Sequence, residues 1–344
     1  MTLPSLSKQR DLLVLSLRAA LDLSPDDPRS FYQIGGIHGS PAQPYMNVTN
    51  QTSHYSNVTA ASRWMVSLNQ NSPAVPDITK VVTYDNTHAP FPLDQGYCEH
   101  GSNLFPAWHR PYVALLESSI TGLAKEIAST YPKALRKDYK LAAEALRWPY
   151  WDWARSKVIP DFLYKPLLEV TGPNGLPMLI TNPFASYTFQ RDTSPDVLQP
   201  NPPAAYSQWP YTVKENFTTV RWPMPTNNTQ YGPYATNVSA LRATLFVNKP
   251  YGVSFAQAVL DLMTIDDWEC FATTASSTNP NCTFMSIEGI HNLIHLYSGG
   301  HLPKPNNTVP GFMSVLETAG FDPIFFLHHA NVDRLIALWQ VCDY

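Results

Sequence analysis

The stretch YCEHGSNLFPAWHRPYVALLESSITGLAKEI, residues 97–127, sets a thiol and two imidazoles at the start of a helical pattern. His100 and His109 are nine residues apart, which on one continuous helix is two and a half turns and puts them on opposite sides. They converge only if the helix begins between them. Pro106 and Pro111 support this, because proline is tolerated in a first turn and not deep inside a helix. We therefore expect His100 on a loop and His109 near the start of a helix.

Helical periodicity recurs along the chain. It predicts six helices, at about residues 10–23, 108–130, 132–146, 254–263, 284–297 and from about 328 to the end. Between residues 148 and 244, Pro, Asn, Tyr and Thr are frequent, which predicts long irregular connections with short strands at most. We expect one mainly α domain over residues 1–344, with large loops. The chain ends within NVDRLIALWQVCDY without a helix stop signal, as a catalytic core or a fragment does.

Composition bounds the class of protein. The chain has 344 residues, of which 44% are hydrophobic, and a formal net charge of −4, so it can bury a sizeable core. No Lys/Arg run stands out, which argues against nucleic acid or an anionic membrane as a partner. No apolar run is long enough to cross a bilayer. The segment RDLLVLSLRAALDLSPDD is interrupted by Arg18 and indicates an amphipathic helix, not a signal peptide.

Sequons and cysteines bear on the compartment. Eight N-x-S/T sequons fall mostly in loop-like stretches, at Asn47, Asn50, Asn57, Asn216, Asn227, Asn237, Asn281 and Asn306. They favour a secreted glycoprotein; the alternative is a cytoplasmic protein in which such triplets occur by chance. The four cysteines do not form a disulfide scaffold. Cys270 and Cys282 flank a polar loop and are candidates for one disulfide.

The segment FMSIEGIHNLIHLYSGG contains the first pair of candidate metal ligands. On a helix, His291 and His295 lie on one face, one turn apart, and Glu288 shares that face. Zinc peptidases place Glu directly after the first histidine, but Asn292 stands there, which argues against that chemistry. The spacing alone leaves a metal role and a core or capping role open.

The segment FDPIFFLHHANVDRLIALWQ, residues 321–340, contains adjacent histidines. On a helix, His329 shares a face with apolar residues: Val332, Ile336 and Trp339. His328 lies about 100° round the helix axis. The periodicity therefore favours His329 as the inward ligand, and the alternative is a helix start with one capping and one buried histidine.

Imidazole-rich sites with few carboxylates suit copper, zinc or iron. A di-iron carboxylate bundle needs two Glu-x-x-His motifs, and Glu288-x-x-His291 is the one well-placed copy. An all-nitrogen, redox-active site favours copper.

Five segments in the same order resemble the tyrosinase family of type 3 copper proteins, especially its fungal members: FYQIGGIHG, YCEHGSNLFPAWHRPY, WPYWDWA, EGIHNLIH and FDPIFFLHHANVDRL. The resemblance implies a four-helix bundle that houses two copper ions, with O2 as co-substrate. It implies one copper ligated by His38, His100 and His109, and a second ligated by His291, His295 and His329. A longer, sequon-rich insertion before His100 leaves His54 and His88 as outside candidates for the first ligand.

The resemblance also implies roles beyond the ligands. Cys98 matches the cysteine that forms a thioether to the histidine at the position of His100. Phe325 matches an aromatic residue that packs over a copper-bound histidine. Glu288 and Asn292 match a pair that orients a water to accept the phenolic proton.

By this resemblance we expect an enzyme that ortho-hydroxylates small monophenols and oxidises o-diphenols to o-quinones, as in melanin formation. The first alternative is a catechol oxidase with little monophenol activity, and Leu296 occupies a position where substrate access can be tuned. A second is an oxygen carrier of hemocyanin type, and a third is a structural α-bundle that binds no metal. Copper content and turnover of tyrosine against a catechol distinguish them. The sequence gives no oligomeric state.

Overall fold

The fold is mainly helical, as the sequence predicts, and its strands are short. The computed structural model describes residues 4–39, 98–156, 159–193, 213–247, 253–275, 279–280, 282, 285–304 and 307–342. The α-helices in these ranges are α1 (Pro4–Asp22), α2 (Phe31–Gly36), α5 (Phe105–Thr130), α6 (Lys133–Ala145), α7 (Val238–Val247), α8 (Phe255–Leu262), α9 (Trp268–Ala272), α10 (Ile287–Gly299), α11 (Leu316–Ala319) and α12 (Ile324–Cys342). The strands form antiparallel pairs: β1 (Leu167–Thr171) with β2 (Pro177–Thr181), β3 (Pro223–Pro225) with β4 (Tyr234–Thr236), and β5 (His301–Lys304) with β6 (Asn307–Pro310).

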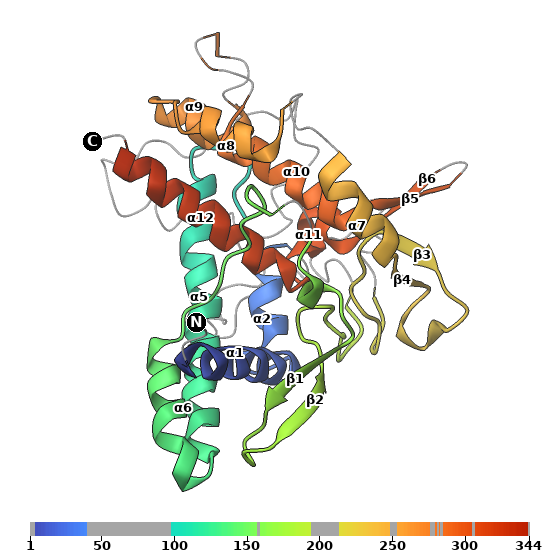
Figure 1. The fold of residues 1–344 in the computed structure, drawn as a ribbon. Helices are drawn as coiled ribbons and strands as arrows, with labels where there is room; N and C mark the ends of the chain where they lie inside the picture. The colour runs from blue at the N-terminus through green and yellow to red at the C-terminus, as the bar shows by residue number, and fades with distance from the viewer. Residues whose placement is uncertain are drawn as a thin grey trace, which may run out of the picture.

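Four helices, α2, α5, α10 and α12, surround the predicted site. The long α5 packs against α12, α12 contacts α10, and the short α2 contacts α5 (Figure 1). Helices α1 and α6 pack against α5 and against each other, below α2, α10 and α12 in this view. The predicted four-helix bundle is therefore confirmed, with the hairpins and long connections arranged around it.

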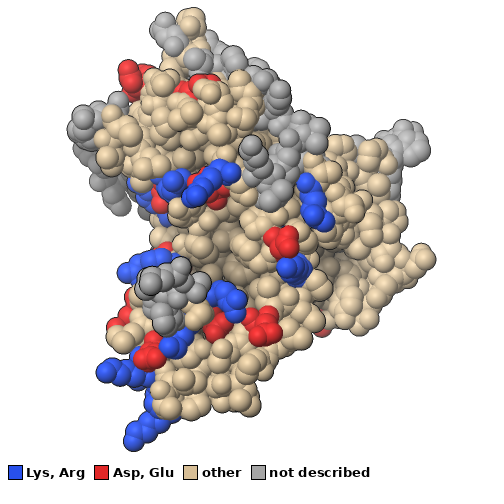
Figure 2. All heavy atoms as spheres, viewed as in Figure 1, with Lys and Arg blue, Asp and Glu red and all other residues tan. Residues whose placement is uncertain are grey.

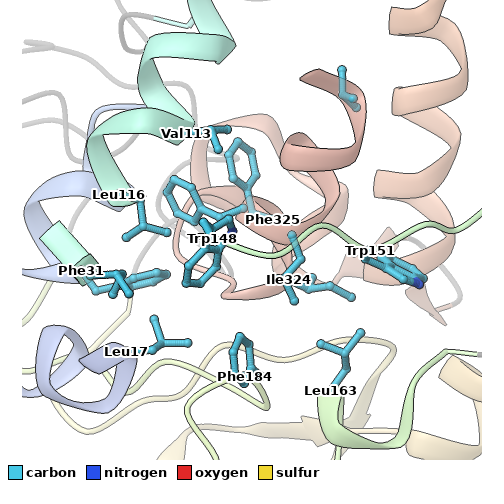
Figure 3. Packing of buried hydrophobic residues seen from close by; sticks show 14 of the residues in the cluster. Leu17, Phe31, Val113, Leu116, Trp148, Trp151, Leu163, Phe184, Ile324 and Phe325 are labelled. Atoms are coloured by element: carbon cyan, nitrogen blue, oxygen red, sulfur yellow. The ribbon is translucent and has the colours of Figure 1, made fainter. Parts of the chain in front are cut away.

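A shared aromatic core fixes these helices relative to one another. Phe31 of α2, Leu116 of α5 and Phe325 of α12 are fully buried, and Trp148 lies among them (Figure 3). The rings of Phe31 and Phe326 meet edge to face, with centroids 5.8 Å apart. Each fully buried side chain of this size contributes about 1.5–3 kcal/mol. Because each helix that carries a histidine contributes to one core, the packing of that core sets the positions of the histidines.

The sequence placed the start of the last helix too late. Helix α12 begins at Ile324, so the two adjacent histidines lie in its second turn and not at a helix start. Asp322 explains the earlier start, because its Oδ1 accepts a hydrogen bond from Ile324 N at 3.1 Å. Pro323 follows Asp322, and proline suits a position where no N–H is needed.

A buried ion pair holds Asp322 in place. Arg221 and Asp322 are each 1% exposed, and Arg221 Nε donates to Asp322 Oδ2 at 2.9 Å. The same guanidinium donates to the carbonyls of Leu163 at 2.6 Å and Phe184 at 2.8 Å. A buried charge is costly unless its hydrogen bonds are made, and here they are made to three separate segments. Arg221 therefore joins the long connections to the start of α12.

The prolines of the opening stretch contradict part of our expectation. Helix α5 does begin between His100 and His109, at Phe105, with Pro106 in its first turn. Pro111 lies inside the helix, beyond the first turn, where we expected no proline. It has no N–H for the carbonyl of Ala107, and the helix continues to Thr130 despite this loss.

Helices α2 and α7, which were not predicted from the sequence, carry capping signals. Ser30 Oγ accepts from Gln33 N at 3.1 Å at the start of α2. Asn237 Oδ1 accepts from Ala240 N at 3.0 Å before α7, which begins inside the region expected to be irregular. Ser and Asn are preferred N-cap residues because their side-chain oxygens accept from the first backbone N–H groups of a helix. These two residues were therefore the signal available in the sequence. The short strands elsewhere in that region agree with the prediction.

Three further features are the disulfide, the distribution of surface charge and the apolar character of the helices. Cys270 and Cys282 form the anticipated disulfide, with Cα atoms 5.1 Å apart. Basic and acidic side chains lie next to one another on the face shown in Figure 2 and do not separate into large patches. Among the described residues, no helix has both the length and the apolar character to cross a membrane.

Candidate metal centre

Apart from His301 on β5, the described histidines gather in two groups where α2, α5, α10 and α12 meet. The first group joins His38, which follows α2, Cys98 and His100 from the loop before α5, and His109 of α5. The second group comes from two helices: His291 and His295 of α10, and His328 and His329 of α12. Within each group, one ligand atom per residue lies within 4.8 Å of the others. His54 and His88, the outside candidates, lie outside the described residues.

The Nε2 atoms converge within each group. His329 Nε2 lies 3.1 Å from His291 Nε2 and 3.2 Å from His295 Nε2. In the first group, His38 Nε2 and His109 Nε2 are 3.5 Å apart. Two nitrogens that each bind one ion at 2.0–2.1 Å in tetrahedral geometry lie about 3.3 Å apart. These separations therefore match a shared metal ion in each group.

Hydrogen bonds at the opposite ring nitrogen fix which atom faces inward. The Nδ1 atoms of three histidines donate to backbone carbonyls: His38 to Leu316 at 2.8 Å, His109 to Phe105 at 2.7 Å and His295 to Met313 at 2.7 Å. His291 Nδ1 donates to Asn292 Oδ1 at 3.0 Å. Since carbonyl oxygens only accept, the proton is on Nδ1 and the lone pair on Nε2. This is the usual orientation of metal-binding histidines.

The protonation states agree with that orientation. Burial lowers the pKa of His109 to about 3 and the pKa of His295 to about 4. Burial likewise lowers the pKa of the other predicted ligands, namely His38, His100, His291 and His329. The imidazoles are therefore neutral at pH 7, as metal ligation requires. Neutral lone pairs that face each other at about 3.3 Å repel unless a cation lies between them, so the donor sets fit a metal.

The two groups lie side by side. The rings of His109 and His329 stack with centroids 4.5 Å apart and planes at 16°. Phe325 is fully buried and stacks on His329 at 4.0 Å, and its ring also meets His38 edge to face at 4.6 Å. The aromatic residue predicted to pack over one ligand thus contacts both groups.

Sequence reasoning missed a second aromatic residue of this kind. The ring centroid of Phe105 lies 4.6 Å from that of His109 and 4.7 Å from that of His291. Phe105 stands four residues before His109, just as Phe325 stands four residues before His329. This repeated F-x-x-x-H spacing was the signal available in the sequence.

Cys98 lies in the first group beside His100. Its Sγ is 2.8 Å from His100 Nδ1, 3.1 Å from His38 Nε2 and 3.5 Å from His109 Nε2. Burial raises the pKa of the Cys98 thiol, so it stays protonated without a metal or a bond to the ring. The thioether stays a prediction, and the short contact with the His100 ring is compatible with it.

Glu288 has more contacts than the sequence indicated. Glu288 is 1% exposed; its Oε1 accepts from Gly101 N at 2.6 Å, beside His100. Its Oε2 accepts from Thr274 N at 2.7 Å, Thr273 Oγ1 at 2.9 Å and Thr274 Oγ1 at 3.0 Å. Burial raises the pKa of Glu288, and these hydrogen bonds oppose the rise. A carboxylate has about four acceptor sites, two on each oxygen, so Oε1 keeps room for a further donor.

A helical bundle with two adjacent, neutral histidine groups is the architecture of a protein that can hold two metal ions side by side. The family model for the common central domain of tyrosinase matches residues 28–341. The chain therefore belongs to the tyrosinase family.

Individual relatives agree. The chain is 32% identical over 343 residues to a tyrosinase from Podospora anserina, covering 96% of this chain and 48% of that protein. The structure of latent and active mushroom tyrosinase superposes with a TM-score of 0.66 at 28% identity, covering 97% of this chain and 70% of that one. A G-type hemocyanin from Enteroctopus dofleini is 28% identical over 243 residues, 71% of this chain and 6% of its own length. The chain spans about half the length of the curated fungal tyrosinases that it matches.

Proposed function

We propose that this chain binds two copper ions and uses O2 to oxidise small phenols, both monophenols and o-diphenols, to o-quinones. The observation that carries the proposal is the convergence of neutral Nε2 atoms into two adjacent groups. Copper suits nitrogen donors, and the tyrosinase family favours it over zinc. When bound, the copper pair supplies O2 binding and the oxidation of the phenol ring.

The chain's own residues have separate tasks in this proposal. His38, His100 and His109 hold the first ion, and a thioether from Cys98 keeps the ring of His100 in place on its loop. On the other side, His291, His295 and His329 hold the second ion. Neighbouring residues orient these imidazole rings through hydrogen bonds and packing, which keeps the nitrogen atoms in place while the enzyme turns over.

Proton removal is the step assigned to Glu288. A phenol must lose its proton to react, and a water on Glu288 Oε1 is the proposed acceptor. Oε1 has one protein donor, Gly101 N, and therefore room for the water. Asn292 contributes through its side-chain oxygen, which accepts a hydrogen bond from His291 Nδ1. This bond places the amide group of Asn292 beside the His291 ring.

A catechol oxidase is the second candidate, and one observation favours it. Glu288 accepts four hydrogen bonds from the protein, which also fits a purely structural carboxylate that ties α10 to the loop of His100. Such an enzyme oxidises catechols and has little activity on tyrosine.

Copper content and oxygen uptake test the proposal together. We expect two copper ions per chain by elemental analysis, and oxygen consumption with both catechol and tyrosine. Consumption with catechol alone selects the second candidate. Reversible oxygen binding without turnover selects an oxygen carrier, and a chain that takes up no copper refutes every copper-based assignment.

We also propose that the chain is exported. The disulfide Cys270–Cys282 suits an oxidising compartment. Among the sequons in the described residues, Asn216 and Asn227 are exposed, whereas Asn237 is half-buried and caps α7. Peptide mass spectrometry of the chain from its native source should find glycans on Asn216 or Asn227 and none on Asn237. Unmodified peptides at all three positions contradict export through a glycosylating pathway.

A further inference from the structure

The second group contains four histidines, whereas the proposed site uses three of them as ligands. His328 is the histidine that is not assigned to the metal. Its ligand atom lies within 4.8 Å of those of His291, His295 and His329, so distance alone does not exclude it. It is fully buried. Something other than position must keep it from acting as a ligand.

Trp153 supplies that restraint. Trp153 Nε1 donates to His328 Nδ1 at 3.1 Å, in a buried contact. An indole nitrogen only donates, so Nδ1 must be the acceptor and carries no proton. An imidazolium has no acceptor nitrogen, so the ring is neutral and its proton is on Nε2. His328 therefore has the opposite tautomer to His291 and His295, and its Nε2 has no lone pair for a metal.

The same ring supports the ligands around it. His328 stacks on His291 with centroids 5.0 Å apart and planes at 13°. It also meets His295 edge to face, with centroids 5.0 Å apart. A rotation of His328 would therefore displace two of the three predicted ligands of the second ion.

Trp153 is itself held firmly. It is 3% exposed, and its ring packs edge to face on Phe255 of α8 at 5.6 Å. Two residues earlier, Trp151 N donates to Leu327 O at 2.9 Å, which joins this segment to the turn of α12 that carries His328. The WPYWDWA segment, to which the proposed function gives no role, thus packs directly behind the second group.

We propose that Trp153 is a positioning residue that locks His328 as a non-ligand and so keeps the second metal group at three nitrogens. The inference rests on the proposed assignment of His291, His295 and His329 as the ligands of one ion. Without the indole N–H, Nδ1 of His328 loses its donor, and the Nδ1-protonated tautomer is no longer excluded. An unprotonated Nε2 would then be available to the metal, and any turn of the ring towards the ion would break its stack on His291.

The first test uses the metal-free protein. Histidine-selective ¹⁵N labelling reports the tautomer of each imidazole by NMR. We expect His328 to carry its proton on Nε2 in the wild type and in W151F, and to shift towards the Nδ1-protonated form in W153F. Trp151 is the matched control, because it lies in the same segment and its buried Nε1 has no hydrogen-bond partner among the described residues. An unchanged His328 tautomer in W153F, or an equal change in W151F, overturns the proposal.

The second test follows metal coordination with Co²⁺, whose visible spectrum reports ligand number. We expect W153F to bind Co²⁺ at the second group about 10-fold or more weakly, with an altered spectrum. The double variant W153F/H328F keeps a stacking ring but removes the competing imidazole, so it should regain the wild-type spectrum. If the double variant keeps the altered spectrum, the change arises from lost packing, and the proposal that Trp153 keeps His328 from binding the metal is wrong. A wild type that binds no Co²⁺ would count against the proposed metal centre, whereas the tautomer measurement needs no metal.

Discussion

His109 of α5 and His329 of α12 stack in parallel across the two histidine groups, with ring centroids 4.5 Å apart. Each ring is also a predicted ligand of its own ion, and the two helices pack directly against each other. The packing of α5 against α12 therefore sets the spacing of the two groups.

Removing one ligand should empty one group only. His329→Ala deletes the nitrogen that faces both His291 and His295 at 3.1–3.2 Å. We expect copper to fall from two ions per chain to one and phenol oxidation to be lost. His301→Ala is the control, because His301 is exposed on β5, and it should keep both ions. Retention of two ions in H329A would contradict the ligand assignment.

Cys98→Ala should affect the first group and spare the second. The sulfur lies 2.8 Å from His100 Nδ1, so its loss frees the loop histidine. We expect weaker copper binding at the first group, with the second still loaded. Mass spectrometry of the copper-loaded wild type should find the chain lighter by two hydrogen atoms, as a thioether requires. The exposed Cys342 provides the control, since C342A should keep the mass difference.

Glu288→Gln should separate the two phenol oxidase activities. The amide nitrogen of Gln faces backbone and hydroxyl donors, which costs about 1–3 kcal/mol of stability. We expect kcat for tyrosine to fall further than kcat for catechol, together with a lower Tm. The exposed Glu269 offers a matched control as E269Q. Equal losses with both substrates would show that the carboxylate acts through structure alone.

Phe105→Leu should weaken both groups, because its ring contacts His109 and His291. Removing part of a fully buried ring should lower the free energy of unfolding by about 1–3 kcal/mol. We expect titration calorimetry with copper to show reduced affinity for both ions. Phe162→Leu, at a 38% exposed position, should change neither quantity. A loss at the first group alone would refute the bridging role.

The metal-free chain should lose stability as the pH falls from about 6.5 towards 4. Burial lowers the pKa of His109 to about 3 and of His295 to about 4, whereas an unfolded histidine titrates near about 6.5. Below about 6.5 the unfolded chain binds protons that the native chain does not, so the free energy of unfolding decreases. Urea midpoints measured from pH 7.5 to pH 5 should therefore fall. H295F removes one such group, and its midpoint should vary less steeply; a midpoint that rises on acidification would contradict the argument.

Sequence alone predicted the main helices because each buries an apolar face at helical spacing. It predicted the loop position of His100 because nine residues cannot return to one side of a helix. Motif resemblance added the choice of His38 and supported His329, which the helical periodicity already favoured as the inward ligand.

Other features could not be obtained in this way. The hydrogen bond from Trp153 to His328 joins residues 175 positions apart, and the contact of Gly101 with Glu288 joins residues 187 apart. No local pattern encodes such contacts. Pro111 misled the analysis for a related reason: tertiary packing of α5 against α1, α6 and α12 outweighs one missing backbone hydrogen bond.

The buried pair Arg221–Asp322 has a consequence for the order of assembly. Asp322 is synthesised 101 residues after Arg221, and it also caps the helix that carries His329. Until Asp322 has been synthesised, the guanidinium of Arg221 has no buried counter-charge, and the segments around Arg221 cannot pack together. The residues of the first histidine group are all synthesised before α12, whereas the second group needs α12 to dock. On the proposed ligand assignment, the second ion can therefore be held only after α12 has docked.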